Sequence, residues 1–456
     1  MLVKFKKYSL FLFSSIFFLS AANAQKKPLF DGKTLNGWKA VAGTAPYTVQ
    51  DGMIVGTMTT GTPNSFLITT KVYSDFILEL DVKLEGAESN SGIQTRSHID
   101  MKANNGQGRV FGRQVEIDPT SRAWTGGIYD EARRLWLYPL DLNPAAKPVY
   151  KKEEFNHYKI ECIGNEIKTW VNGVPVAYVI DTLDKTGFIG LQVHNIGANK
   201  KLIGKKVYFK NINIQTENLK PQAFPKGIYT VNLTPNTLSA YEKLNGYKLL
   251  FDGKSNAGWL GAYKTAFPNK GWEIANGQLT VLPANGAEST NGGDIVTKEE
   301  FTAFDLSFEF KLTEGANSGV KYFVTLAEKN TGSAIGLEYQ VLDDERHPDA
   351  KLGRDGNRTL ASLYDLMTVK KEARFLRPIG SWNNGRLVVY PNNKVEHYLN
   401  GVKVLEYTRG SEEFKKLVAI SKYKDWKNFG EAPKGHLLLQ DHGNKVSFRT
   451  IKVKTF

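Results

Sequence analysis

An internal repeat constrains the fold of this chain more than any other feature of its sequence. The segment FDGKTLNGW at residues 30–38 recurs as FDGKSNAGW at residues 251–259. Three more pairs follow in the same order: NSGI (90–93) and NSGV (317–320), WVNGV (170–174) and YLNGV (398–402), and GLQVH (190–194) and LLQDH (438–442). Each unit is long enough to bury its own core, so the repeat predicts two tandem domains rather than a solenoid.

The spacing of these blocks sets the expected domain boundaries. We place the first domain at residues 25–216, a proline-containing linker with a short helix near its end at 217–244, and the second domain at 245–456. Between its last two blocks the second copy is longer than the first. The extra segment lies around Arg409 to Lys434 and has no counterpart in the first copy.

Within each copy the hydrophobic residues follow the period of a strand. Residues 76–84 (FILELDVKL) and 304–312 (FDLSFEFKL) alternate between apolar and polar side chains. Tight two-residue turns are expected where Asn or Asp precedes Gly, because both central residues take positive φ: Asp51-Gly52, Asn172-Gly173, Asn276-Gly277 and Asn400-Gly401. Many strands with close turns and few amphipathic helices predict an all-β chain of two antiparallel sandwiches or jelly rolls.

The N-terminus has the three parts of a secretory signal peptide. Three lysines precede the apolar run LFLFSSIFFL at residues 10–19, and Ala22-Asn23-Ala24 follows it. The run has about half of the roughly 20 apolar residues that a membrane-spanning helix needs. We therefore expect cleavage after Ala24, which makes residues 1–24 a signal peptide, and a periplasmic or secreted protein without membrane insertion.

The composition adds little support for a nucleic-acid partner. The formal charge is +14, but the lysines are scattered along strands and turns instead of clustering on one helix. Such a distribution is more typical of a soluble surface than of a nucleic-acid-binding one.

The ordered set of motifs resembles a known family, the 3-keto-disaccharide hydrolase domain, also described as 3-keto-glucoside 1,2-lyase and 3-keto-2-hydroxy-glucal hydratase. The resemblance covers nearly all of the mature chain, twice. It rests on the opening FDGK and GW, the Asn-Ser-Gly strand, the strand EYQVLDD at residues 338–344, the Asn-Gly hairpin and the ending QDHG at 440–443. It implies a concanavalin A-like jelly roll for each copy.

The resemblance also implies a reaction on glycosides that carry a ketone at carbon 3. The ketone acidifies the hydrogen on carbon 2, so a general base removes it and the enolate expels the group at carbon 1; hydration of the resulting glycal completes a net hydrolysis. Such a site needs a base, an electropositive group for the enolate and an acid for the leaving group. A non-catalytic, lectin-like carbohydrate-binding protein and a glycosidase with paired carboxylates are the alternatives.

Polar residues two positions apart share one face of a strand and supply the candidates for this chemistry. In both copies a Glu and a Gln occur in this spacing, in opposite order, and a Gln precedes a His near the end. The candidate catalytic residues are Glu116, His194, Glu338, His442 and His397. The candidate substrate-binding residues are Gln94, Arg96, Gln114, Trp124, Tyr129, Trp136, Gln192, Lys321, Gln340, Tyr364 and Gln440.

A group of acids and a histidine in the second copy raises the question of a metal. Asp343, Asp344, His347 and Asp441 have the donor atoms for a divalent ion, and such an ion would stabilise an enolate. The same residues also fit an acidic turn neutralised by arginines. The sequence leaves the cofactor open and predicts two related but chemically different sites.

Overall fold

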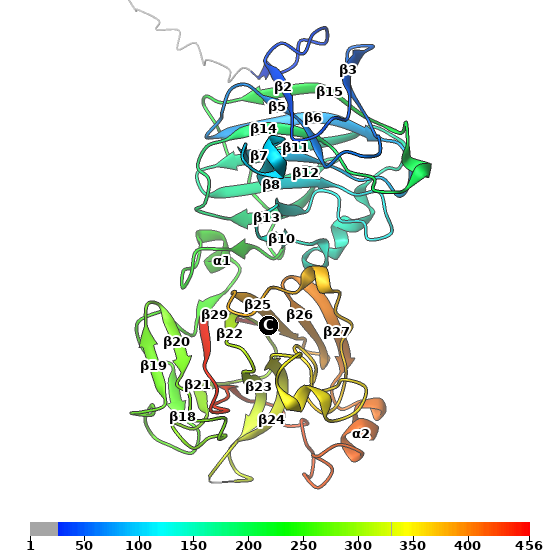
Figure 1. Cartoon of the computed structure of the whole chain (residues 1–456). Coiled ribbons are helices and arrows are strands. Elements are labelled where there is room, and N and C mark those ends of the chain that lie inside the picture. Colours follow the sequence, from blue (N-terminus) through cyan, green and yellow to red (C-terminus); the bar gives the residue numbers. More distant parts are fainter. Residues whose placement is uncertain (1–25, 330) are drawn as a thin grey trace, which may run out of the picture.

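The computed structural model describes residues 26–329 and 331–456. The expected signal peptide lies outside these residues. The all-β prediction is confirmed, because each half of the chain folds into two facing sheets. Figure 1 shows the first half of the chain above the second. Within the described residues no helix has the length and apolar character to cross a membrane.

The first domain pairs a nine-stranded sheet with a seven-stranded sheet. The larger sheet runs in the order β16-β13-β12-β11-β6-β15-β4-β3, with β1 beside β15. Its strands are β1 (Lys27–Pro28), β3 (Tyr47–Gln50), β4 (Met53–Thr57), β6 (Phe76–Leu84), β11 (Asn156–Ile163), β12 (Glu166–Val171), β13 (Val174–Ile180), β15 (Lys206–Gln215) and β16 (Val231–Asn232). The smaller sheet, in the order β10-β9-β8-β7-β14-β5-β2, contains β2 (Trp38–Val41), β5 (Ser65–Thr69), β7 (Ser91–Asp100), β8 (Arg109–Ile117), β9 (Ile128–Glu131), β10 (Leu135–Tyr138) and β14 (Phe188–Val193).

The second domain repeats this plan with an eight-stranded and a five-stranded sheet. The larger sheet, β19-β20-β29-β22-β25-β26-β27 with β17 beside β29, contains β17 (Lys248–Leu249), β19 (Trp272–Ala275), β20 (Gln278–Val281), β22 (Phe304–Leu312), β25 (Asn383–Val389), β26 (Lys394–Leu399), β27 (Val402–Thr408) and β29 (Val446–Thr455). The smaller sheet, β18-β21-β28-β23-β24, contains β18 (Trp259–Gly261), β21 (Ile295–Phe301), β23 (Asn317–Thr325), β24 (Ile335–Leu342) and β28 (Gly435–Leu439).

Helices are few and short. The α-helices are α1 (Ala240–Leu244), which Ser239 and Glu242 close with a capping box, and α2 (Glu412–Ala419). The 3₁₀ helices are η1 (Asn104–Gly106), η2 (Leu140–Leu142), η3 (Pro144–Val149), η4 (Lys200–Leu202), η5 (Pro348–Lys351) and η6 (Ala373–Phe375).

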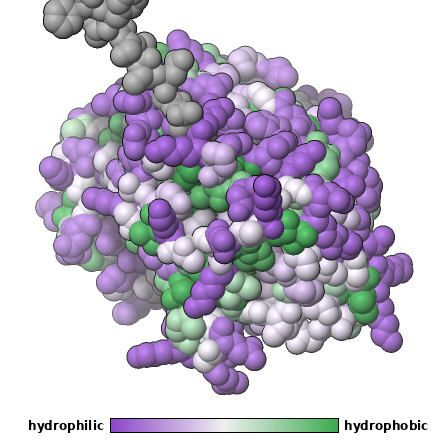
Figure 2. All heavy atoms as spheres, turned by 90° about the horizontal axis from the view of Figure 1, so that it is seen from above, coloured by the Kyte–Doolittle hydropathy of each residue, from purple (hydrophilic) through white to green (hydrophobic). Residues whose placement is uncertain are grey.

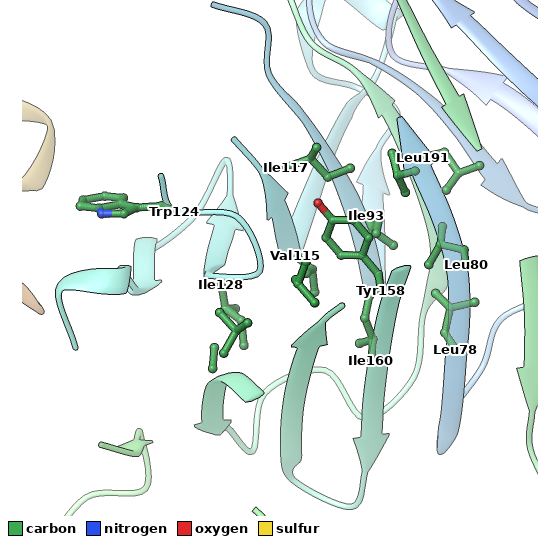
Figure 3. Close-up of a cluster of buried hydrophobic side chains, with 14 of the residues drawn as sticks. Leu78, Leu80, Ile93, Val115, Ile117, Trp124, Ile128, Tyr158, Ile160 and Leu191 are labelled. Atoms are coloured by element: carbon green, nitrogen blue, oxygen red, sulfur yellow. The ribbon is translucent and has the colours of Figure 1, made fainter. Parts of the chain in front are cut away.

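The core of each domain lies between its two sheets, where the inward residues of the alternating strands meet. Figure 3 shows this for the first domain: Leu78, Leu80, Tyr158 and Ile160 come from the larger sheet, and they pack against Ile93, Val115, Ile117 and Leu191 of the smaller one. All eight are buried. Hydrophilic side chains cover most of the surface of this end of the molecule, with a small hydrophobic area near its middle (Figure 2).

All four expected two-residue turns are confirmed, since both residues of each have positive φ. One of them also forms part of the contact between the domains. The turn Asn400-Gly401 packs against Pro139, and a Cβ atom on Gly401 would lie 2.8 Å from the proline ring. Glycine is therefore needed there both for its φ of 83° and for the close approach.

The linker makes ordered contacts with both domains. The strand β16 extends the large sheet of the first domain, and its Asn232 donates a hydrogen bond of 2.8 Å to Glu242 of α1. Lys452 of β29 in the second domain donates to the same carboxylate at 2.5 Å. In Figure 1 α1 lies between the two sandwiches. A buried ion pair thus connects the domains through the linker.

Replacing Lys452 by Met should destabilise the protein by about 3 kcal/mol, because it leaves Glu242 buried without its counter-charge. The double variant K452M/E242Q should recover part of the loss, since it removes the unpaired charge as well. Denaturant unfolding followed by tryptophan fluorescence measures both. A K452M variant as stable as the wild type would contradict this account of the linker.

Candidate active site

The five-stranded sheet of the second domain lines a cavity of about 250 Å³. Lys321 of β23 lies opposite Glu338 of β24 in the strand register, and Gln440 follows the end of β28. These residues share the outward face of the sheet because side chains alternate along a strand. The cavity brings together six of the residues selected from the sequence, namely Lys321, Glu338, Gln340, Tyr364, Gln440 and His442.

Glu338 is the carboxylic acid at the base of this cavity. It is 4% exposed, and burial raises the pKa of its carboxyl to about 7, against the opposing effect of the lysines Lys321 and Lys422. Lys321 Nζ lies 3.9 Å from the Glu338 carboxylate, too far for a strong hydrogen bond, and instead donates to Ser333 Oγ at 2.6 Å and to the Ala334 carbonyl at 3.1 Å. A carboxyl with this pKa exchanges protons readily at neutral pH.

The Asn-Ser-Gly motif has a direct role in placing this acid. Gly319 of β23 lies under the Glu338 side chain, and a Cβ atom at Gly319 would come within 2.3 Å of Glu338 Oε1. In the first domain Gly92 has the same relation to Gln114, with 2.2 Å to the side-chain amide carbon. The glycine therefore leaves room for the side chain from the neighbouring strand in both copies.

Two loops and the extra segment of the second copy form the walls. The segment after α2 contributes Lys422, Tyr423 and Trp426, and Tyr364 comes from the connection between β24 and β25. The Lys422 ammonium group lies 4.2 Å from the centre of the Tyr364 ring. Burial lowers the pKa of Lys422, and among the described residues its Nζ has no hydrogen-bond acceptor.

Glu288 adds a second carboxylate on the opposite side. Gln440 Nε2 donates to it at 3.1 Å. Burial acts to raise the pKa of Glu288, but the positive charges of Lys321 and His442 outweigh it and hold that pKa below its usual range. Glu288 is therefore the ionised acid of the cavity, whereas Glu338 is poised between its two forms.

Several polar atoms of the cavity lining are buried without a partner. Asn317 Oδ1, Gln440 Oε1 and His442 Nδ1 make no hydrogen bond to any residue that the structure describes. Buried polar groups in proteins are nearly always satisfied, so three unpartnered atoms in one lining set this cavity apart from the packed core. None of the three is exposed, so a ligand reaches them only if the lining rearranges.

In the first domain the corresponding residues bond to one another and to an arginine. Gln94 donates to Gln114 at 2.7 Å, and Gln114 donates to Glu116 at 3.1 Å. Glu116 is 3% exposed, and burial raises the pKa of its carboxyl to about 7 against the opposing charge of Arg122. The guanidinium of Arg122 lies 3.1 Å from Glu116 and 2.7 Å from Asp118, so it occupies the position beside the acid.

The remaining residues selected at the end of the first copy lie nearby. Gln192 is fully buried, and neither side-chain polar atom has a partner among the described residues. His194 is half-buried with Nδ1 2.6 Å from the Asn195 carbonyl, and burial lowers the pKa of its imidazole.

Of the three aromatic residues expected to line a sugar groove, two are buried in packing contacts. Trp124 and Trp136 are buried edge to face at 4.7 Å, and Trp124 packs against Phe375 of the second domain. The Arg122 guanidinium covers both indoles at 4.9 Å. Only Tyr129, which packs against Trp136 at 5.2 Å, is half-exposed. The two tryptophans therefore stabilise the domain contact and present no free face to a sugar.

Arg96 and His397 also lie away from any cavity. Arg96 is 2% exposed and binds the Gly164 carbonyl and Asp75, on the side of the strand facing away from Gln94 and Gln114. His397 is 0% exposed in the core of the second domain, where it bonds Tyr322 and the Ala361 carbonyl, and burial lowers its pKa to about 4. Both positions argue against a direct role in chemistry, because neither side chain can reach a substrate.

The proposed metal ligands are not brought together. Asp441 accepts hydrogen bonds from the backbone amides of Gly292, Gly293 and Gly443, and Asp343 likewise binds backbone amides and Arg346. Asp344 pairs with Lys371 at 2.5 Å, and His347 caps η5. No group of three or more His, Cys, Asp or Glu side chains within the described residues is arranged to hold a metal ion. These residues shape loops around the cavity.

Sequence reasoning missed Glu288, Lys422, Tyr423 and Trp426. The last three lie in the extra segment around Arg409 to Lys434, and its restriction to one copy was the signal that could have identified them. Glu288 lies in an irregular loop without any motif.

Known proteins are similar to this chain in both halves. A family model for the 3-keto-alpha-glucoside-1,2-lyase-like domain matches residues 25–215 and again residues 246–454. A 3-keto-disaccharide hydrolase of Bacteroides thetaiotaomicron (strain ATCC 29148) is 37% identical over 232 residues, covering 46% of this chain and 78% of that protein.

Among solved structures, a candidate glycosyl hydrolase from Parabacteroides distasonis ATCC 8503 is 29% identical, with a TM-score of 0.43, and the match covers 49% of this chain and 100% of the other. A β-glucanase from Bacillus licheniformis is 12% identical, with a TM-score of 0.28 and coverage of 42% and 96%. The family match extends over both jelly rolls, and the chain therefore belongs to the family of 3-keto-alpha-glucoside-1,2-lyase-like domains, which it contains twice.

Proposed function

We propose that the second domain cleaves 3-keto-glycosides by elimination, with Glu338 as the base. One observation carries this proposal: a buried carboxyl with a pKa of about 7 lies in a cavity of about 250 Å³ between two lysines. The name of the Bacteroides relative, a 3-keto-disaccharide hydrolase, supports the same substrate class. The first domain also has a buried carboxyl with a pKa of about 7, Glu116, but Arg122 pairs with it, whereas Glu338 lies 3.9 Å from its nearest cation and lines the cavity.

In the proposed first step Glu338 takes the hydrogen on carbon 2 as a proton. The electron pair of the broken C–H bond forms the enolate, with its negative charge on the oxygen at carbon 3. The enolate then restores the ketone, the C1–C2 double bond forms, and the bond from carbon 1 to the leaving oxygen breaks. The leaving oxygen takes up a proton and departs as an alcohol.

Addition of water completes a net hydrolysis. The hydroxyl group of water bonds to carbon 1, its remaining proton goes to the group that protonated the leaving oxygen, and carbon 2 regains a proton from the protonated Glu338. The product is the 3-keto sugar, and Glu338 returns to its starting form. One residue thus serves as base and then as acid, a role that fits a pKa close to the working pH.

Lys422 is suited to stabilise the enolate, and His442 is suited to protonate the leaving group. The Lys422 ammonium has free donors and is positioned over Tyr364, so it can stabilise the enolate oxygen. His442 lies in the same lining, and an imidazole is suited to protonate the leaving oxygen. Lys321, held by Ser333 and Ala334, provides the fixed charge beside Glu338.

We propose that the first domain does not perform this reaction. Its sheet has Gln94 and Gln114 at the positions of Lys321 and Glu338, and Arg122 pairs with the one remaining carboxyl, Glu116. We also propose that the protein acts after export from the cytoplasm. The support is the N-terminal pattern of lysines, apolar run and Ala22-Asn23-Ala24.

Replacing Glu338 by Gln should lower kcat/KM for a 3-keto-disaccharide about 100- to 10,000-fold, the usual contribution of a general base. The matched control is E116Q, which removes the other buried carboxyl with a pKa of about 7 and should leave activity near the wild-type level. Both variants keep the side-chain shape. Loss of activity in E116Q with full activity in E338Q would place the reaction in the first domain and contradict the proposal.

The activity should rise with pH through an apparent pKa near 7, because Glu338 must be deprotonated to accept a proton. The effect of this group on stability has the opposite sign: its folded pKa lies above the ordinary 4.5, so its contribution is complete below that value and disappears as pH rises through about 7. Measurement of kcat/KM from pH 5 to 9 tests the predicted dependence of activity on pH. A profile without an inflection between pH 6 and 8 would exclude Glu338 as the base.

A further inference from the structure

A second cavity of about 390 Å³ lies directly beside the first. The two share Ile335, Gly336 and Trp426 in their linings. The first cavity, at about 250 Å³, is smaller than most ligand pockets, which begin near about 300 Å³. Alone it has room for little more than one sugar ring, so a larger substrate has to extend past Trp426.

The second cavity has one half-exposed aromatic ring and a polar rim. Trp426 contributes the aromatic surface, with the buried rings of Phe323 and Phe429 behind the lining, and Glu328, Asn428 and Glu431 contribute polar groups around it. Sugar rings present C–H groups on their faces and hydroxyl groups at their edges. Aromatic rings accommodate the faces, and carboxylates and amides bind the hydroxyl groups.

The wall is held in shape without a ligand. Arg409 stacks over Phe323 at 3.7 Å and donates hydrogen bonds to the carbonyl groups of Gly430 (3.0 Å) and Ala432 (2.5 Å). Phe429 stacks on Tyr423 at 3.9 Å, which links this wall to the first cavity. Such preformed pockets lose little conformational entropy on binding.

We propose that this second cavity is the subsite for the leaving group and that it takes a sugar. The inference rests on the proposed function, because it assigns the 3-keto ring to the first cavity. Trp426 marks the junction, so the bond that breaks lies next to it. Most of the wall belongs to the segment present only in the second copy, so that segment determines which leaving groups are accepted.

The test fills the second cavity without changing the first. Ala432 lines the second cavity alone, so A432W should block it. The matched control is K424W, which adds the same bulk to the same segment at an exposed position outside both linings. Two substrates are compared by kcat/KM: a methyl 3-keto-glucoside, which leaves the second cavity empty, and a 3-keto-disaccharide of glucose.

A432W should lower kcat/KM for the disaccharide by about tenfold or more and leave that for the methyl glycoside near the wild-type value. K424W should change neither. T325W, which fills the cavity from the opposite wall, should repeat the pattern of A432W. Equal losses with both substrates, or no loss with either, would overturn the subsite.

Binding of free glucose, measured by ligand-observed NMR, separates this inference from the proposed function. Glucose should bind less well to A432W than to the wild type and K424W, whether or not turnover occurs, because only the first cavity then remains open to it. Absence of turnover by the wild type would refute the elimination and leave the binding result to decide the subsite. A phenyl 3-keto-glucoside that loses more than the disaccharide in A432W would show that the cavity prefers a flat aromatic group.

Discussion

Burial of the Glu338 carboxyl is the constraint on which the site depends. Removing a carboxylate from water is costly unless a counter-charge is close, and Lys321 at 3.9 Å offsets only part of that cost. The result is a pKa near 7 instead of 4.5. The surrounding structure maintains this balance: Gly319 leaves room for the side chain, and Ser333 and Ala334 keep Lys321 from moving closer. A tighter ion pair would give a permanent carboxylate and a weaker base.

The two copies present different side chains on one scaffold. Both have a glycine under the side chain at the Gln114 or Glu338 position, and both have a backbone irregularity on the same strand, with positive φ at Arg96 and Phe323. They differ in the polar side chains on the outward face of those strands. In the first copy amides bond to one another and Arg122 covers the acid, while Trp124 packs against Phe375 of the second domain. The first domain thus contributes to the architecture through the contact and the linker.

Much of the fold could be predicted from the sequence, because strand alternation and Asn-Gly turns are local signals that tertiary structure did not override. Glu338 and Gln340, and likewise Gln440 and His442, were expected to share a face from the same alternation, and all four line one cavity. Residues outside regular strands were harder. Trp124 and His397 were selected by residue type, which does not reveal that Trp124 packs against the neighbouring domain and that His397 lies in the core. The wall formed by Lys422 and Trp426 depends on how an inserted loop folds back, for which no sequence period exists.

The central claim is that the C–H bond at carbon 2 breaks before the glycosidic bond. A 3-keto-glycoside with deuterium at carbon 2 tests it directly when its kcat/KM is compared with that of the unlabelled substrate. The account predicts markedly slower turnover of the deuterated substrate by the wild type, because Glu338 removes that atom. Equal rates, together with a product that retains all of its deuterium at carbon 2, would show direct hydrolysis and contradict the elimination.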